Sequence, residues 1–274
     1  MAADSNERFD PEKYWESRLG SDYSLKGVGY ISLGENFNKW LYRVKGKVFL
    51  KIVRDTKLEL DIRRFSVLDI GSGTGFVIEL WKKSGAKNIV GSDFTEVVVR
   101  NLRKQFPELR FVRLDIGSHD IEETDISIKT FDAISALDVL YHIVNDKSFS
   151  AALKNIYNLL RPGGFFIYSD NFLHGGRRNS GVHQVSRSLE EISTILHSIG
   201  FEIVYRKPQS VIMNYPVDSR SKAKKILWKL VVMPSSQSEL YGNVMGAIMY
   251  PMDLLLTSLL RESATTEIMV CRKT

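Results

Sequence analysis

An apolar run that leads into three alternating glycines constrains the fold of this chain of 274 residues more than any other feature. Residues 65–70 have strand character, Gly71, Gly73 and Gly75 follow at every second position, and residues 76–81 take helical spacing. Glycine can adopt positive φ angles and lets the backbone approach a ligand, and the first amides of a helix are unpaired. The segment therefore predicts a strand, a turn and a helix that hold a nucleoside cofactor.

Two acidic residues narrow the choice of cofactor. Asp93 closes a second short apolar run, residues 88–93, where a carboxylate can accept both ribose hydroxyls of a nucleoside. The third glycine comes one position too early for the G-x-G-x-x-G pattern that cradles a diphosphate in dinucleotide folds. Asp69 precedes the glycines, where it would repel a diphosphate but suit a cationic group such as a sulfonium. The spacing thus favours a cationic nucleoside cofactor.

Residues 69–75 match the pattern D-x-G-x-G-x-G completely, and here the chain resembles the class I S-adenosylmethionine-dependent methyltransferases. The resemblance covers about residues 65–206 and resumes near the C-terminus. It includes segments similar to the third strand, the fourth strand with the active-site segment, and the fifth strand of that family, at residues 110–116, 131–142 and 159–168. The resemblance implies an α/β fold with a Rossmann-like, doubly wound sheet of seven mostly parallel strands. It also implies an antiparallel last strand. Outside the common core, this chain's own pattern adds a helical segment at the N-terminus and a helical insertion before the last strand.

The same resemblance implies the cofactor. S-adenosylmethionine would bind and leave as S-adenosylhomocysteine, and no metal is expected. Asp93 would hold the ribose, and Asp115 would face the amino group of adenine. The cofactor-binding residues that it implies are Asp69, Gly71, Ser72, Gly73, Gly75, Asp93, Phe94, Asp115, Ile116 and Leu137.

The segment before the core, residues 1–64, is expected to be helical. Apolar positions in residues 37–52 keep helical spacing and predict one long helix against the sheet. Further upstream, Tyr14, Trp15 or Tyr30 closes the cofactor site as a lid, or these aromatic residues only pack on the surface. Both interpretations are compatible with the sequence.

The segment after the core, residues 207–264, is expected to be a helical cap or a substrate-specificity insertion, with the last strand at residues 265–274. Between residues 206 and 229, seven basic residues and one acid give a surplus equal to the net charge of +6. Residues 222–233 place apolar and lysine side chains on different faces, which favours peripheral contact with an anionic membrane or a simply solvated lysine face.

A second apolar stretch, residues 244–260, lies within this insertion. Pro251 and Asp253 interrupt it, and it is shorter than the about 20 residues that a membrane span needs. We therefore expect no transmembrane segment, and we interpret the stretch as helices that cover the acceptor pocket.

Candidates for the chemistry follow the fourth and fifth strands, because ligands bind beyond the carboxyl ends of the strands. His142 and Tyr141 follow the fourth strand, and His174 and His183 lie in a glycine-rich basic loop after the fifth. Imidazole can accept a proton near neutral pH, so these four are the candidate catalytic residues, with His142 first.

The basic loop also supplies candidates for acceptor binding. Arg177, Arg178 and Arg187 are expected to bind the acceptor, together with Tyr30 from the N-terminal segment. A guanidinium group can grip a carboxylate or a phosphate through paired hydrogen bonds. In the alternative, the arginines are exposed and pair with nearby acids. The expected partner is a small-molecule or peptide acceptor that is anionic.

These residues predict O-methylation of a small or peptide-like acceptor with an acidic group, such as a natural-product intermediate, a peptide carboxylate or a sugar. A carboxylate acceptor needs only positioning, whereas an alcohol needs a base such as His142. Nucleic acid is disfavoured, because residues 137–140 lack the two prolines that follow Asn or Asp in amide- and base-methylating members of the superfamily. A non-catalytic scaffold or sensor and a nucleotide-dependent oxidoreductase are the alternatives.

Composition bears on the compartment. Cys271 is the single cysteine, which excludes a disulfide within the chain, and residues 1–10 are polar without an apolar signal region. A cytoplasmic location is expected, and the oligomeric state is left open.

Overall fold

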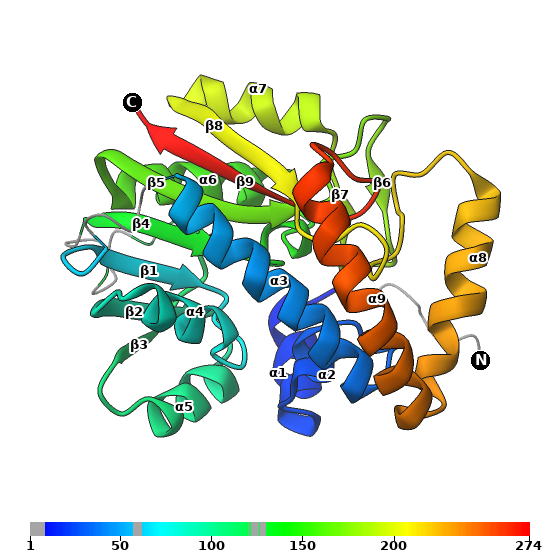
Figure 1. Ribbon diagram of the computed structural model, residues 1–274. Coiled ribbons are helices and arrows are strands. Elements are labelled where there is room, and N and C mark those ends of the chain that lie inside the picture. Colours follow the sequence, from blue (N-terminus) through cyan, green and yellow to red (C-terminus); the bar gives the residue numbers. More distant parts are fainter. Residues whose placement is uncertain (1–8, 57–61, 120, 122–125, 127–129) are drawn as a thin grey trace, which may run out of the picture.

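The computed structural model describes residues 9–56, 62–119, 121, 126 and 130–274. A seven-stranded sheet lies at its centre, with the strand order β3-β2-β1-β4-β5-β9-β8 (Figure 1). Its strands are β1 (Ser66–Ile70), β2 (Asn88–Asp93), β3 (Arg110–Arg113), β4 (Phe131–Ala136), β5 (Leu160–Asp170), β8 (Phe201–Pro208) and β9 (Glu267–Lys273). The first five strands pair in parallel, and β9 runs antiparallel to both β5 and β8. The predicted doubly wound sheet with an antiparallel last strand is confirmed.

Hydrophobic cores lie on both faces of this sheet. Successive strand residues point to opposite faces, so Ile268 and Val270 of β9 join one core while Met269 and Cys271 join the other. The first core is covered by α3 (Glu35–Asp55), α4 (Phe76–Ser84) and α5 (Glu96–Gln105), and the second by α6 (Asp146–Leu159) and α7 (Leu189–Ile199). Burial on both faces explains the consecutive apolar residues within strands, such as Val67 and Leu68 in β1 and residues 268–271 in β9.

The ends of α7 follow the sequence signals. Ser188 is the N-cap, and its Oγ accepts a hydrogen bond from the backbone N–H of Glu191 (3.1 Å). Gly200 follows the last turn with φ +111°, a left-handed conformation that glycine adopts without strain. Serine before the helix and glycine after it thus mark both ends, and β8 begins at the next residue.

The N-terminal segment contributes three helices, α1 (Pro11–Ser21), α2 (Leu25–Val28) and the predicted long helix α3. Glu16 on α1 accepts a hydrogen bond from the backbone N–H of Val97 (3.0 Å), which opens α5. Tyr23 lies just before α2, and its hydroxyl donates a hydrogen bond to the backbone carbonyl of Gly73 (2.8 Å). These contacts hold α1 and α2 over the carboxyl ends of the strands (Figure 1).

The insertion forms α8 (Lys222–Val232), the short helix η4 (Met233–Ser236), and α9 (Glu239–Leu259), which lies alongside α3 (Figure 1). The apolar stretch of residues 244–260 belongs almost entirely to α9, which continues through Pro251 as one helix. Asp253 is fully buried in α9. It accepts hydrogen bonds from the Ser210 hydroxyl (2.7 Å) and from the backbone amides of Val211 and Ile212. These contacts stabilise the helical turn that follows Pro251 and offset the free-energy cost of a proline inside a helix.

Among the described helices, α9 included, none combines the length and the apolar character that crossing a bilayer requires.

Candidate functional site

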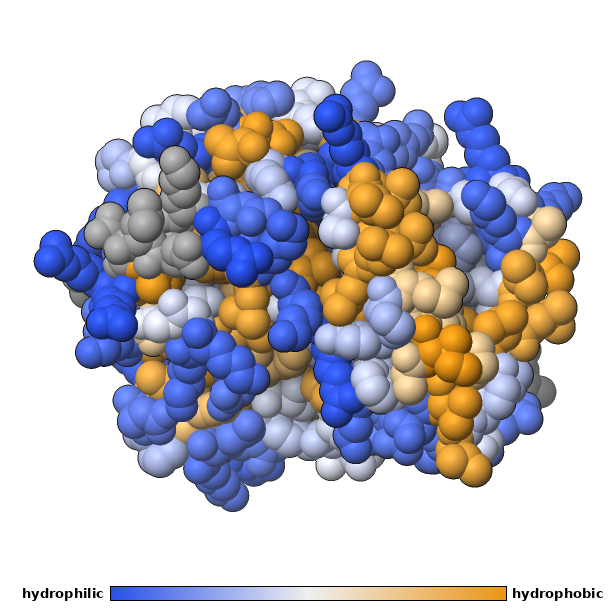
Figure 2. Space-filling view, viewed as in Figure 1, coloured by the Kyte–Doolittle hydropathy of each residue, from blue (hydrophilic) through white to orange (hydrophobic). Residues whose placement is uncertain are grey.

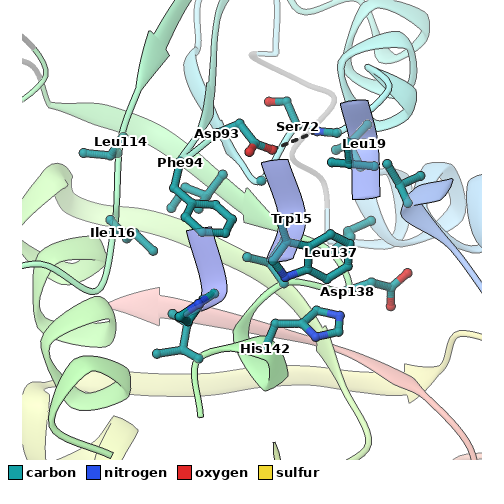
Figure 3. Close-up of a pocket in the computed structure, with 18 of the residues that line it drawn as sticks. Trp15, Leu19, Ser72, Asp93, Phe94, Leu114, Ile116, Leu137, Asp138 and His142 are labelled. Carbon is teal, nitrogen blue, oxygen red and sulfur yellow. Dashed lines mark hydrogen bonds between the residues drawn. The ribbon is translucent and has the colours of Figure 1, made fainter. Parts of the chain in front are cut away.

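A cavity opens beyond the carboxyl ends of the parallel strands (Figure 3). The turn after β1, the residues that follow β2, β3 and β4, and side chains of α1 and α3 line it. The sequence-predicted residues that line the cavity are Gly71, Ser72, Gly73, Asp93, Phe94, Asp115, Ile116, Leu137 and His142. Residues from distant parts of the sequence are thus brought to one place, as the strand order requires.

The turn after β1 needs glycine at two positions, because of backbone conformation and of close contacts. Gly71 has φ +66°, and a Cβ atom there would lie 2.4 Å from Cγ2 of Val139. Gly73 has φ +52° and lies under α2, held by the Tyr23 hydroxyl. Burial and the nearby Asp93 raise the pKa of Tyr23 to about 12, so this hydroxyl remains a donor at neutral pH.

Gly75, the third glycine of the motif, contacts α5 rather than the cavity. It does not line the cavity, and its φ is +83°. A Cβ atom on Gly75 would lie 2.6 Å from the ring of Phe106. This glycine therefore lets α4 begin and pack against the end of α5, and its predicted contact with the cofactor stays a prediction.

Asp93 points into the cavity from the end of β2 (Figure 3). Its Oδ1 accepts hydrogen bonds from the amide (3.1 Å) and hydroxyl (2.8 Å) of Thr95, and its Oδ2 from the amide of Gly73 (3.3 Å). Burial raises the pKa of this carboxyl in spite of these hydrogen bonds. The bonds fix the orientation of the carboxylate, which then presents lone pairs to a bound diol.

An apolar slot lies beside Asp93. Phe94, Leu114, Ile116 and Leu137 line it, and Figure 3 shows these side chains around the same space. Asp115 follows β3 and accepts a hydrogen bond at Oδ1 from the amide of Gly117 (2.9 Å). A carboxylate for ribose hydroxyls, an apolar slot for a purine ring and a second carboxylate for an exocyclic amino group together fit an adenosine-containing cofactor.

Asp69 does not line the cavity, contrary to the expectation that it faces the cation of the cofactor. It is fully buried beneath the glycine turn, where its Oδ1 accepts a hydrogen bond from the Ser135 hydroxyl (2.6 Å). Its backbone carbonyl accepts hydrogen bonds from the hydroxyls of Ser72 and Ser92, both at 3.1 Å. Burial raises the pKa of the Asp69 carboxyl to about 7. In this geometry Asp69 supports the turn from below.

A polar cluster lies on the other side of the cavity, after β4. The Lys45 ammonium of α3 pairs with Asp138 (2.6 Å), and both side chains are nearly buried. Asp138 has φ +61°, a strained conformation for a residue that is not glycine, and it accepts a hydrogen bond from the Ser169 hydroxyl (2.8 Å). Strain that is held by surrounding contacts is common at functional sites.

Gln209 completes this side of the cavity from the end of β8. The residue is fully buried, yet neither its amide nitrogen nor its amide oxygen has a hydrogen-bond partner among the described residues. Leaving a buried polar group unpaired costs about 1–3 kcal/mol. Such a side chain at a cavity wall is suited to a polar ligand.

His142 lies at the mouth of the same cavity, in the short helix η3 (Leu140–His142). Its Nδ1 is 2.9 Å from the carbonyl oxygen of His183, and Trp15 of α1 packs edge-on against its ring. Because a carbonyl oxygen only accepts, Nδ1 carries the hydrogen and Nε2 keeps a lone pair. Burial lowers the pKa of His142 to about 4, so the ring is neutral at physiological pH.

The other catalytic candidates lie outside the cavity lining. Tyr141 is partly buried, and burial together with Asp138 holds its pKa well above the ordinary value. His183 stacks on Tyr14. His174 pairs with Asp218 (2.8 Å) and Glu262 (3.2 Å), and the hydrogen bond to Asp218 raises its pKa. Catalytic roles for these three residues stay predictions, and the structure gives each of them a structural contact.

The basic loop pairs with acids and carbonyls rather than opening into the cavity. Arg177 forms two hydrogen bonds of 2.7 Å with Asp146, and Arg178 donates to the carbonyl of Val217 (2.7 Å). Arg187 is completely buried, pairs with Asp146 (2.8 Å) and lies over the ring of Phe149.

This placement corrects the expectation that Arg187 grips the acceptor, because its guanidinium group belongs to the core. The alternative of arginines paired with nearby acids fits the observed geometry. Tyr30, the remaining acceptor-binding candidate, packs against Trp228 and does not line the cavity. Acceptor contacts of Arg177, Arg178 and Tyr30 stay predictions.

Lys45 and Gln209 were missed at the sequence level. A signal existed for Lys45, because it lies four residues after Leu41 and four before Phe49, on the apolar face of the predicted helix. A lysine at such a position needs a partner or a function. Gln209 lies in a segment without periodic pattern, and only the fold brings it to the cavity.

Comparison with known proteins agrees with this geometry. Residues 67–164 match the model of a family described as "Methyltransferase domain". Residues 67–164 form a methyltransferase domain with the fold of the class I S-adenosylmethionine-dependent enzymes. S-adenosylmethionine is the cofactor of this family, and the carboxylates and apolar slot around Asp93 fit it. The match argues against the alternative of a nucleotide-dependent oxidoreductase.

Individual relatives of this methyltransferase domain are distant. The chain is 25% identical over 147 residues to the mRNA cap guanine-N(7) methyltransferase of Caenorhabditis elegans, covering 48% of this chain and 37% of that protein. It is 32% identical over 110 residues to the tRNA U34 carboxymethyltransferase of Azotobacter vinelandii, covering 38% and 32%. The chain thus spans about a third of the length of these curated relatives.

Among solved structures, the magnesium protoporphyrin IX methyltransferase of Synechocystis PCC 6803 with bound S-adenosylmethionine is similar over nearly the whole chain. The two share 15% of their residues with a TM-score of 0.58, covering 98% of this chain and 100% of that one. At this identity the likeness concerns the fold alone, and it includes the N-terminal and inserted helices.

Proposed function

We propose that the chain transfers the methyl group of S-adenosylmethionine to a carboxylate oxygen of a small or peptide-like acceptor. The single observation that carries the proposal is the division of one cavity into a nucleoside-binding half and a polar half. The buried, unpaired amide of Gln209 lies in the polar half, opposite the carboxylate of Asp93.

The strand order supports this division. The glycine turn, Asp93 and Asp115 follow β1, β2 and β3, which form one side of the sheet. Asp138 and Gln209 follow β4 and β8, which lie on the other side. A cofactor bound over the first three strands would leave the second half of the cavity for an acceptor. This juxtaposition is what in-line transfer between two bound molecules needs.

The polar half favours an acceptor with an acidic group. Lys45 brings a buried positive charge to the cavity wall, and Asp138 holds its ammonium group in place. Gln209 can donate two hydrogens and accept at its oxygen, so it can meet a carboxylate or an amide. In this proposal the Lys45–Asp138 pair and Gln209 bind the acidic group of the acceptor. The sequence alone assigned that role to the arginines of the basic loop.

The electrostatics of His142 favour an acceptor that is already an anion. With a pKa of about 4, His142 is neutral but takes up a proton only weakly. A carboxylate, whose ordinary pKa is about 4, needs no base at neutral pH, whereas an alcohol does. His142 then acts by position: its ring and that of Trp15 form one wall of the cavity.

The bound cofactor supplies an electrophilic methyl group on a positively charged sulfur. In the transfer, the acceptor oxygen forms a bond to the methyl carbon while the carbon–sulfur bond breaks and its electron pair stays on sulfur. The products are the methyl ester and S-adenosylhomocysteine, and no proton has to move. The protein aligns the two reactants and limits the access of water.

The N-terminal helices serve as the lid in this proposal. Pro11, Trp15 and Leu19 of α1 line the cavity, and the Tyr23 hydroxyl ties the start of α2 to the glycine turn. Trp15 also contacts the ring of His142. Release of these contacts would open the cavity for exchange of cofactor and acceptor.

The proposal is tested by incubating the purified chain with methyl-labelled S-adenosylmethionine and acceptor panels. Carboxylic acids, peptides, phenols, sugars and RNA form separate panels, the last because two relatives are named for mRNA cap and tRNA. We expect label in base-labile methyl esters of the carboxylic acids or peptides. Label only in RNA, or in no panel although the cofactor binds, would contradict the proposal.

The cytoplasmic location, which rests on the single buried thiol of Cys271, is part of the same proposal.

Gln209→Leu is expected to raise KM for the acceptor at least about tenfold, because a hydrogen bond at a buried site is lost. The affinity for S-adenosylmethionine should not change, since Gln209 lies in the other half of the cavity. The free energy of unfolding should rise by about 1–3 kcal/mol, because the unpaired buried amide is removed. Steady-state kinetics, calorimetric titration and thermal unfolding measure the three effects.

The matched control is Gln105→Leu, on the exposed end of α5. It should leave all three quantities unchanged. If Gln209→Leu lowered stability, its amide would be a structural group and the assignment to the acceptor would fail.

With a carboxylate acceptor, neither the acceptor nor His142 is expected to make the rate depend on pH between about pH 6 and about pH 8. Neither a carboxylate of ordinary pKa nor His142, with its pKa of about 4, changes charge in that range. His142→Asn should lower kcat less than about tenfold and leave this profile unchanged. A profile that rises with pH in the wild type and flattens in the variant would instead make His142 a general base, with an alcohol as acceptor.

A further inference from the structure

One face of α9 exposes a continuous row of apolar side chains. Its large members are between 48% and 75% exposed: Leu240, Val244, Ile248, Met252, Leu255 and Leu259. Spacings of three and four residues put them on the same side of the helix, opposite the side that packs on α3. Figure 2 shows this row as an apolar band over α9.

A second apolar row lies on the neighbouring α8. Ile226, Leu227 and Leu230 are 57–69% exposed, while Trp228 points inward and donates to the carbonyl of Ile212 (3.1 Å). The exposed apolar atoms of α8 appear beside those of α9 in the same view (Figure 2). Of the thirteen large apolar residues exposed in the described part of the chain, ten lie in residues 226–260. A patch of this kind normally marks a binding surface.

The exposed charged side chains of α8 all have one sign. Lys222, Lys224 and Lys229 are exposed on α8 and flank its apolar row. Residues 222–260 contain two acidic residues, and among the described contacts neither forms an ion pair with these lysines. Asp253 is buried, and Glu239 accepts hydrogen bonds from the backbone amides of Glu35 and Asn36 (both 2.8 Å).

We propose that the exposed faces of α8 and α9 bind the surface of an anionic lipid bilayer. Amphipathic helices that lie in a membrane interface combine an apolar face with flanking lysines, whose stems reach along the apolar region while the ammonium groups meet headgroups. A second copy of the chain fits less well, because a two-fold contact through this face would bring like charges together. The inference does not rest on the proposed reaction.

The buried side of α9 packs on α3, which contributes to the acceptor half of the cavity. Gly246 lets α9 approach α3 so closely that a Cβ atom there would lie 2.3 Å from the ring of Trp40, and α3 carries Lys45. Residues 210–221 connect Gln209 to α8. The helices of the proposed membrane face are thus joined through α3 and through residues 210–221 to residues of the acceptor half of the cavity.

The test is co-sedimentation of the full chain with vesicles of phosphatidylcholine alone and of phosphatidylcholine mixed with phosphatidylglycerol. We expect binding to the anionic vesicles that weakens with salt, and much weaker binding to the neutral ones. Lys224→Glu/Lys229→Glu should reduce partitioning at least about thirtyfold, because each lysine near an anionic surface contributes about fivefold. Ile248→Ser/Leu255→Ser should also reduce it at least about tenfold.

Matched variants serve as controls. Lys83→Glu/Lys104→Glu makes the same charge change on α4 and α5, and Ile31→Ser/Val182→Ser makes a similar polarity change at other exposed sites. Neither should lower vesicle binding comparably. Equal losses in test and control pairs, or no binding to anionic vesicles, would overturn the proposal.

Sedimentation equilibrium without lipid separates the remaining outcome. A stable dimer that Ile248→Ser/Leu255→Ser turns into a monomer would show that the face joins two copies, and the lipid proposal would be wrong. A wild-type monomer that binds anionic vesicles supports it. Methyl transfer to a soluble acceptor should be the same in wild type and Lys224→Glu/Lys229→Glu, so failure of one proposal does not depend on the other.

Discussion

Asp93→Ala is expected to weaken the binding of S-adenosylmethionine by about a hundredfold or more. The carboxylate is directed into the cavity by Thr95 and Gly73, so the ribose hydroxyls meet an acceptor that is already in place. Hydrogen bonds to a charged group contribute about 1.5–3 kcal/mol each, and two of them account for an effect of this size. Calorimetric titration with S-adenosylmethionine and S-adenosylhomocysteine measures it, and both ligands should lose affinity alike.

Asp93→Asn separates ligand binding from the support of the turn. The amide oxygen can still accept from Thr95, but the amide nitrogen cannot accept from Gly73 or from a hydroxyl. We expect a large loss of affinity with an unfolding midpoint close to that of the wild type. Gln209→Leu is the matched control at the other end of the cavity and should keep cofactor affinity. Equal losses in Asp93→Ala and Gln209→Leu would refute the division of the cavity into two halves.

Asp146→Ala is expected to lower the free energy of unfolding by about 2–3 kcal/mol. Arg187 is fully buried, and without Asp146 the contacts left to its guanidinium group among the described residues are the carbonyl of Ile143 (3.0 Å), Glu191 at 3.8 Å and the ring of Phe149. Removing one partner of a buried charge costs several kcal/mol, and we take a lower value because the Asp146 side chain is 59% exposed and screened by water. Denaturant unfolding measures the change.

Two further variants test the cause of this loss. Arg177→Ala removes the exposed partner of Asp146 and should cost less than about 1 kcal/mol. Asp146→Ala/Arg187→Met removes the buried charge as well and should recover much of the loss. No recovery in the double variant would show that packing, rather than the unpaired charge, is responsible.

The pH dependence of this contribution has a definite sign. Hydrogen bonds from Arg177 and then Arg187 lower the pKa of Asp146 from 3.8 to about 2. Because the pKa is lower in the folded state, the stabilisation is complete above about pH 4 and is lost as the pH falls towards about 2. Between these values the wild type should lose stability more steeply than Asp146→Ala. Equal slopes would contradict the pairing.

Sequence reasoning succeeded where local geometry and function coincide. The run of Gly71 and Gly73 after a strand predicted the turn, because few residues adopt those φ angles without strain. Asp93 was predicted from its place at the end of a strand, since the topology fixes where that end lies. The ends of α7 at Ser188 and Gly200 likewise depend on local hydrogen bonding and conformation.

The remaining site depends on which distant groups meet. The sequence shows that Arg187 is charged but not that Asp146 lies beside it, and the expected acceptor contact was therefore wrong. Asp69 belongs to the motif, yet the pleat of β1 turns its side chain away from the cavity. Gln209 becomes part of the site only because β8 joins the sheet beyond β9. Such placements follow from long-range pairing, which local patterns do not contain.

The position of β9 has a consequence for biosynthesis. It fills the space between β5 and β8, two strands made much earlier, and pairs with both along most of its length. Until residues 267–273 have left the ribosome, β5 and β8 each present an open edge with unpaired backbone groups. Exposed edges of this kind recruit other chains, so the nascent protein depends on chaperones or on fast completion until β9 docks.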